Sequence, residues 1–143
     1  MKAGIVLLVA GLAVGLSITS AAAAGSCPPS EAAFVEENIQ QVETWAQFST
    51  FYFQHKKCDV DALRYAFTQQ VAHLAANDQG MLGLSKMLAK HPQLKPMLLK
   101  HLKSEAVTSD DRDQILKALD ACQVSQKKIC RDVKKMIDSA SSS

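Results

Sequence analysis

Four cysteines constrain the fold of this 143-residue chain more than any other feature: Cys27, Cys58, Cys122 and Cys130. All four follow an N-terminal segment with the composition of an export signal, and an even cysteine count in an exported chain predicts two disulfide bonds. Three pairings are possible. Cys122 ends one helical pattern and Cys130 begins the next, so we expect them to pair, which leaves Cys27 for Cys58. Closing the short loop contributes roughly 2.5 kcal/mol to stability, and closing the longer loop somewhat more.

The N-terminal segment has the three parts of a secretory signal peptide. One positive charge, on Lys2, precedes an uncharged run over residues 3–18, and small residues over 21–26 provide an A-x-A cleavage signal. We predict a signal peptide over residues 1–24, cleaved after Ala24 or one residue earlier. Removing 24 of the 143 residues leaves a mature chain of 119 that contains all four cysteines.

The N-terminus has two other interpretations. An uncleaved membrane anchor needs about 20 apolar residues, and the segment reaches that length only if its alanines, serines and threonines are counted. A lipoprotein anchored through Cys27 is the alternative, because small residues precede this cysteine as in a bacterial lipobox. Ala24 stands where that motif usually has leucine, and lipidation would leave an odd set of three cysteines. We therefore predict export to the periplasm of a Gram-negative envelope, without a transmembrane span in the mature chain.

Helical patterns recur along the mature chain, and strand patterns are nearly absent. Ser30 is the predicted N-cap of the first helix. After it, apolar residues repeat at three- and four-residue steps, which predicts one amphipathic helix of about 25 residues. Asp59 and Thr108 are predicted N-caps of later helices, and Pro96 is expected near the start of a short helix. The first helix carries an unusual number of aromatic residues, of which we expect most in the core and some in an exposed patch: Phe34, Trp45, Phe48, Phe51, Tyr52 and Phe53.

The composition is that of a globular protein, with 48% hydrophobic and 21% charged residues. This balance excludes a disordered chain and a fibrous repeat. We predict an all-α fold, a compact bundle of five to six helices with two disulfides. It forms a single domain over residues 25–138, followed by a disordered tail over residues 139–143.

Charge is divided unevenly along the chain. Residues 25–78 carry seven acids against three bases, a net charge of −4, and residues 79–143 carry twelve bases against seven acids, a net charge of +5. No aromatic residues interleave with the lysines, so we expect no nucleic-acid partner. The positive half offers one possible interaction face for an acidic protein patch or an anionic membrane surface, formed by Lys86, Lys90, Lys95, Lys100 and Lys103.

No residue pattern predicts catalysis, a cofactor or a metal. The four histidines are not spaced with other ligands as in a metal site, and no C-x-x-C pattern suggests zinc. Nucleophile-elbow, P-loop and dinucleotide-binding patterns are absent. Asp110, Asp111 and Asp113 are typical of a helix start rather than of a pair of catalytic carboxylates.

One stretch resembles a group of small, exported, all-helical bacterial proteins. The resemblance rests on His91-Pro92-Gln93-Leu94, on a short helix that ends in His101-Leu102, and on the paired cysteines Cys122 and Cys130. In size, export and helical content the chain is also similar to periplasmic immunity proteins against the amidase toxins of type VI secretion. These motifs are structural, so the resemblance implies a fold and a compartment and assigns no functional residue.

These features predict a periplasmic, non-enzymatic protein-interaction module, immunity- or inhibitor-like, that binds another envelope protein through an exposed helix or loop. The alternative is a periplasmic binder or chaperone for apolar ligands, with the segment Met81–Leu102 as its groove. A small enzyme is the third hypothesis. It requires a cleft that brings a histidine, such as His73 or His101, to an aspartate.

Overall fold

A computed structural model of the protein describes residues 26–77 and 79–141, and these residues form α-helices and short 3₁₀ turns without a strand. The predicted all-α fold is confirmed, but the expected number of five to six helices is wrong. The described residues form seven α-helices: α1 (Pro29–Asn38), α2 (Trp45–His55), α3 (Asp61–Ala76), α4 (Gly80–Lys90), α5 (Lys95–Leu102), α6 (Ser109–Asp120) and α7 (Lys127–Ser141). Four 3₁₀ turns join them: η1 (Ile39–Gln41), η2 (Lys56–Cys58), η3 (Pro92–Leu94) and η4 (Val124–Gln126).

The extra helix arises because the predicted 25-residue helix is interrupted. The chain passes from α1 through η1 and leaves helical geometry before Thr44, whose backbone is extended. The Thr44 side chain accepts a hydrogen bond from the Gln47 backbone N–H, and the Gln47 side chain accepts one from the Thr44 backbone N–H. This reciprocal capping box starts α2 as a separate helix.

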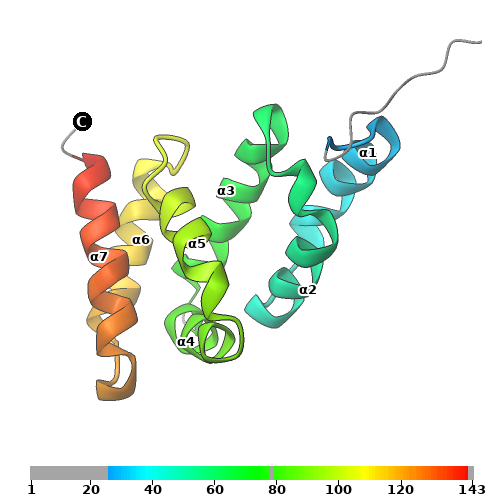
Figure 1. Cartoon of the computed structure of the whole chain (residues 1–143). Coiled ribbons are helices and arrows are strands. Elements are labelled where there is room, and N and C mark those ends of the chain that lie inside the picture. The colour runs from blue at the N-terminus through cyan, green and yellow to red at the C-terminus, as the bar shows by residue number, and fades with distance from the viewer. Residues whose placement is uncertain (1–25, 78, 142–143) are drawn as a thin grey trace, which may run out of the picture.

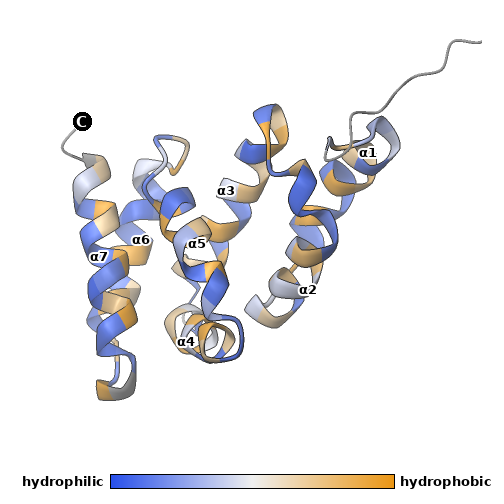
Figure 2. Ribbon diagram, viewed as in Figure 1, coloured by the Kyte–Doolittle hydropathy of each residue, from blue (hydrophilic) through white to orange (hydrophobic). Residues whose placement is uncertain are grey.

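Helix α3 is the centre of the fold. It packs against α1, α4, α5 and α6, and its most extensive contacts are with α6 and α5. In Figure 1, α6 and α7 lie together at one end of the molecule and α1 and α2 at the other, with α3, α4 and α5 between them. Both polar and apolar residues occur along every helix (Figure 2), as an arrangement of amphipathic helices around a shared core requires.

One hydrophobic core runs through this arrangement and draws on all seven helices. Phe48 and Phe67 are its largest fully buried side chains, and Leu84, Leu98, Ile115 and Ile137 extend it through α4, α5, α6 and α7. The aromatic residues expected on the first helix are less buried than predicted. Trp45 and Phe48 are buried, Phe51 and Tyr52 are half-buried, and Phe34 and Phe53 are exposed.

Both predicted disulfides are present. Cys27 is bonded to Cys58, which ties the start of the described chain to η2, and Cys122 is bonded to Cys130, which closes the connection between α6 and α7. No free cysteine remains among the described residues.

The sequence predictions for the chain ends and for two helix starts have different outcomes. The predicted signal peptide, residues 1–24, lies outside the described residues. Ser139, Ala140 and Ser141, expected in the tail, belong to α7, and Ala140 is buried. Thr108 caps α6 as predicted, because its hydroxyl accepts a hydrogen bond from the Asp111 backbone N–H. The first helix starts at Pro29 without a side-chain cap, so the interpretation of Ser30 as its cap is wrong.

Within residues 26–77 and 79–141, no helix combines the length and the apolar character needed to cross a bilayer.

Candidate functional site

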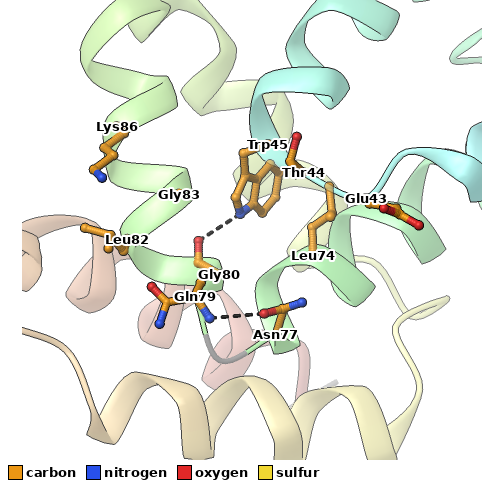
Figure 3. Close-up of a pocket in the computed structure, with 10 residues that line it drawn as sticks. All are labelled: Glu43, Thr44, Trp45, Leu74, Asn77, Gln79, Gly80, Leu82, Gly83 and Lys86. Carbon is orange, nitrogen blue, oxygen red and sulfur yellow. Dashed lines mark hydrogen bonds between the residues drawn. The ribbon is translucent and has the colours of Figure 1, made fainter.

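Trp45 is the anchor of the seam between α2 and α4. Its indole is 4% exposed, and the Nε1–H donates a hydrogen bond to the Gly80 carbonyl oxygen at 2.8 Å. Gly83 faces the edge of the ring, where a Cβ would lie 2.9 Å from Trp45 Cδ1 (Figure 3). Glycine at position 83 therefore lets the two helices approach closely enough for the indole to reach the start of α4.

Two clefts open on either side of this seam. The first, of about 340 Å³, lies toward the turn between α3 and α4 and is drawn in Figure 3, with Glu43 and Lys86 among its lining residues. The second, of about 420 Å³, lies between α2 and the other end of α4. Trp45 and Met87, both buried, contribute apolar surface to this second cleft, and Lys86 and Lys90 stand exposed along it.

We call the second cleft the Trp45–Lys90 cleft. Its lining residues are Thr44, Trp45, Ala46, Ser49, Thr50, Gly83, Lys86, Met87, Lys90 and His91. No acidic side chain is in this set, so the cleft is apolar within and positively charged along α4. Lys86 and Lys90 are one helical turn apart, and like charges at that spacing repel each other.

A third surface cleft lies between α1 and α2. It measures about 560 Å³ and is lined by Phe34 and Phe51 together with polar residues, chiefly glutamines. Phe34, 49% exposed, stacks on Phe51 with ring centroids 6.4 Å apart. The ring of His55 contacts both phenylalanines, and its Nδ1 lies 2.9 Å from Glu31 Oε1, so this aromatic cluster fastens α1 to α2.

The most chemically distinctive group of residues is a buried polar network beside α3. His101 of α5 is 4% exposed, and its Nε2 lies 2.9 Å from Asp59 Oδ2 while its Nδ1 lies 2.7 Å from Thr68 Oγ1. With a neutral imidazole, Nε2–H donates to the Asp59 carboxylate and the Thr68 hydroxyl donates to Nδ1. The Tyr52 hydroxyl also donates to Asp59 Oδ2, at 3.3 Å.

The network changes the ionisation of Tyr52. Burial raises the pKa of the Tyr52 phenol to about 12, and the negative charge of Asp59 and its hydrogen bond with the phenol act in the same direction. A phenolate there would face the carboxylate that the phenol now donates to. Tyr52 therefore remains a hydrogen-bond donor over the physiological pH range.

The arrangement has the carboxylate–imidazole–hydroxyl order of a nucleophilic catalytic triad. It brings His101 to an aspartate, which is the pairing that the enzyme hypothesis requires. Thr68, however, is only 1% exposed, so its hydroxyl is covered where a triad nucleophile must reach its substrate. The hydrogen bonds of this network connect α2, the η2–α3 junction and α5.

Sequence reasoning missed Asp59 as a member of this network. Asp59 was expected to cap α3, but the N-cap is Val60, and Asp61, the first helical residue, has a φ of 48°. The Asp59 carboxylate instead accepts hydrogen bonds from His101 and Tyr52. No local signal marks this role, because Asp59 and His101 are 42 positions apart.

The five predicted interface lysines are not at one cleft. Lys86 and Lys90 line the Trp45–Lys90 cleft, and Lys100 lines a separate polar cleft next to His101. Lys95 forms an ion pair with Asp132 of α7, and Lys103 is exposed just after α5. The structure thus keeps Lys86 and Lys90 as one pair and places the other three elsewhere.

Metal binding finds no support in the described part of the chain, where no three histidine, cysteine or acidic side chains are grouped as ligands. His91 packs edge-on against Phe53, and His73 is exposed on α3.

Comparison of the chain with protein families, with curated proteins and with solved structures finds no match in any of the three.

Proposed function

We propose that this chain is an exported, non-enzymatic interaction module, immunity- or inhibitor-like, that binds an acidic segment of another envelope protein in the Trp45–Lys90 cleft. The two disulfides support the compartment, because such bonds persist in oxidising environments and are rare in the cytosol. The Cys27–Cys58 bond also favours a soluble mature form over the lipoprotein alternative. A lipid thioether would need the Cys27 sulfur that this bond occupies.

The observation that carries the proposal is the chemistry of the Trp45–Lys90 cleft. Lys86 and Lys90 are exposed, neither forms an ion pair with another described residue, and the cleft has no acidic lining residue. A partner segment with an acidic residue would relieve the repulsion between the two lysines. An apolar side chain of the same segment would be held against Trp45 and Met87, since aromatic anchors in pockets supply much of the energy of protein interfaces.

The apolar-ligand alternative is less well supported. Most of the strongly apolar residues of the segment Met81–Leu102 are used in the core. Met81, Leu84, Leu94, Leu98 and Leu102 are buried, and Met87 presents only the surface that lines the Trp45–Lys90 cleft. Leu88, Met97 and Leu99 are half-buried and pack against the same core. The segment therefore does not present them as a groove. The clefts that do exist are open surface features with charged or polar rims, which favour a peptide over a neutral apolar molecule.

Charge reversal at the two lysines tests the proposal directly. The mature protein, the variant Lys86→Glu/Lys90→Glu and the control Lys127→Glu/Lys128→Glu are immobilised and exposed to envelope extract from the source organism. All four lysines are exposed, so the two variants make the same change of charge at exposed positions. We expect the wild type and the control to retain a stoichiometric partner that the Lys86/Lys90 variant loses. Absence of any stoichiometric partner, or equal retention by all three proteins, contradicts the proposal.

Trp45 offers a second, partner-independent readout, because it is the only tryptophan of the chain. A synthetic peptide of alternating glutamate and leucine is titrated against the protein, with the lysine–leucine peptide as its charge-reversed counterpart. We expect a saturable change in tryptophan emission with the acidic peptide, weakened by added salt and by Lys86→Glu/Lys90→Glu. An equal response to both peptides would exclude charge recognition at this cleft.

A further inference from the structure

A polar cleft between α3 and α5 lies apart from the Trp45–Lys90 cleft. It measures about 240 Å³, and every lining residue is polar or charged: Asp59, Arg64, Thr68, Lys100, His101 and Ser104. Three of these, Asp59, Thr68 and His101, belong to the buried network described above. The other three extend it toward solvent and form no part of the proposed protein interface.

The Asp59 carboxylate has one oxygen without a donor. Oδ2 receives hydrogen bonds from His101 and Tyr52, whereas Oδ1 is buried and has no hydrogen-bond partner among the described residues. The nearest cation, Arg64 Nε, is 4.0 Å away, which is too far for a hydrogen bond. Buried carboxylate oxygens are normally paired, so Oδ1 is an acceptor that a bound group with an N–H can satisfy.

The outer side of the same cleft carries donors that lack an acceptor, whereas Asp59 Oδ1 is an acceptor that lacks a donor. Arg64 is half-exposed and makes one long hydrogen bond, 3.4 Å, to the Asp59 backbone carbonyl. Lys100 is exposed and forms no ion pair with any residue that the structure describes. Ser104 Oγ accepts a hydrogen bond from the Ala106 backbone N–H, and its own hydroxyl proton is available to a ligand. These groups together suit a carboxylate.

We propose that this cleft binds a small free α-amino acid as the zwitterion. The ammonium group donates to Asp59 Oδ1, and the carboxylate is held by Arg64 and Lys100. In this proposal Arg64 turns away from the Asp59 carbonyl to reach the ligand, and the buried Oδ1 becomes accessible to the ammonium group in the same movement. A ligand with both charges pairs with both sides at once. A simple anion leaves Asp59 Oδ1 without a donor, and a simple amine leaves Arg64 and Lys100 without a carboxylate.

The dimensions and the supporting network favour a small ligand. The volume of about 240 Å³ is below the roughly 300 Å³ at which pockets for drug-sized ligands begin, which favours a ligand of the size of a single amino acid. His101, fixed by hydrogen bonds at both ring nitrogens, holds the Asp59 carboxylate in place before a ligand arrives. Binding therefore orders only the Arg64 and Lys100 side chains.

Calorimetric titration with matched small molecules tests the proposal. Glycine, L-alanine and L-serine are compared with acetate, which has only the negative group, and with methylammonium, which has only the positive group. We expect saturable binding of the amino acids and at least about tenfold weaker binding of acetate and methylammonium, as expected when a charge-assisted hydrogen bond is lost. Acetate binding as tightly as L-alanine, or no binding of any amino acid, overturns it.

Variants identify the site and separate it from the protein interface. Lys100→Gln should weaken L-alanine binding about tenfold or more, whereas the neighbouring exposed Lys103→Gln should bind as the wild type does. Both lysines lie at the surface, so neither change removes a core contact. Lys86→Glu/Lys90→Glu should leave L-alanine binding unchanged, and this separates failure here from failure of the proposed protein interaction. Equal binding by Lys100→Gln and wild type contradicts the site.

Discussion

At the scale of single residues, His101 links two members of the buried polar network. It joins Asp59 to Thr68, and both of its ring nitrogens are used. Removing one member of a buried, hydrogen-bonded pair leaves its partner without compensation for lost hydration. The network therefore matters for stability whether or not its cleft holds a ligand.

His101→Ala is expected to lower the free energy of unfolding by about 3 kcal/mol, because it leaves Asp59 and Thr68 without their shared partner. Urea denaturation followed by circular dichroism measures the change. The matched control is His73→Ala, which removes an exposed histidine and is expected to change stability by less than about 0.5 kcal/mol. Equal losses in the two variants would show that the network adds nothing beyond the general effect of a histidine deletion.

Tyr52 gives the same network a spectroscopic signature. Its pKa is raised to about 12, first by burial and then by Asp59, so the phenol ionises at higher pH than a free tyrosine, near 10. The pKa of Tyr52 is higher in the folded protein than in the unfolded chain. The contribution of the protonated phenol to the free energy of unfolding is therefore complete below pH 10 and is lost as the pH rises toward 12. An absorbance titration at 295 nm should show a step near pH 12 that Tyr52→Phe abolishes. A titration unaltered by Tyr52→Phe contradicts the assignment.

The sequence could not supply this network, for a physical reason. His101 is 42 positions from Asp59 and 33 from Thr68, so the three side chains meet only after α3 and α5 have packed. Periodicity and capping rules describe residues within about one helical turn of each other. They assign Asp59 a local role as a cap, and the tertiary contact prevails. That a histidine and an aspartate together would mark a site was foreseeable, but the identity of the aspartate was not.

At the scale of elements, the break between α1 and α2 shows what hydrophobic periodicity reports. Val35, Ile39, Val42, Trp45 and Phe48 follow one another at three- and four-residue steps, and all five are buried. Yet the chain is not helical from Val42 to Thr44. The pattern therefore identified the buried face correctly and said nothing about continuity of the helix. The Thr44-x-x-Gln47 capping box was the local signal for the break.

Thr44→Ala is expected to lower the free energy of unfolding by about 1 kcal/mol, because it removes the side-chain oxygen that caps α2. The matched control is Thr50→Ala, at an exposed position inside the same helix, where the threonine hydroxyl donates to the Ala46 carbonyl. Alanine has the higher helix propensity, so this control should be neutral or slightly stabilising. Guanidinium denaturation of both variants decides, and a larger loss for Thr50→Ala than for Thr44→Ala would contradict the capping role.

At the scale of the whole molecule, the sequence was most informative about covalent organisation. The four cysteines and the helical patterns around them predicted an all-α bundle with both disulfides correctly paired. This succeeded because Cys122 and Cys130 flank one short connection, so that a local argument settled one pair and elimination settled the other. The two clefts proposed as binding sites were not accessible in the same way, since one lies between α2 and α4 and the other between α3 and α5.

The two disulfides should contribute unequally to the stability of the whole molecule. Cys27–Cys58 joins residues 31 positions apart and Cys122–Cys130 residues 8 apart, and the longer loop restricts the unfolded chain more. The chain-entropy relation gives about 3.7 kcal/mol for the first bond and about 2.5 kcal/mol for the second. We expect Cys27→Ala/Cys58→Ala to lower the thermal midpoint of unfolding more than Cys122→Ala/Cys130→Ala does. The wild type in excess reductant, which loses both bonds, should have a lower thermal midpoint than either variant. A reversed order would show that packing around α6 and α7, rather than loop closure, governs the contribution of these bonds.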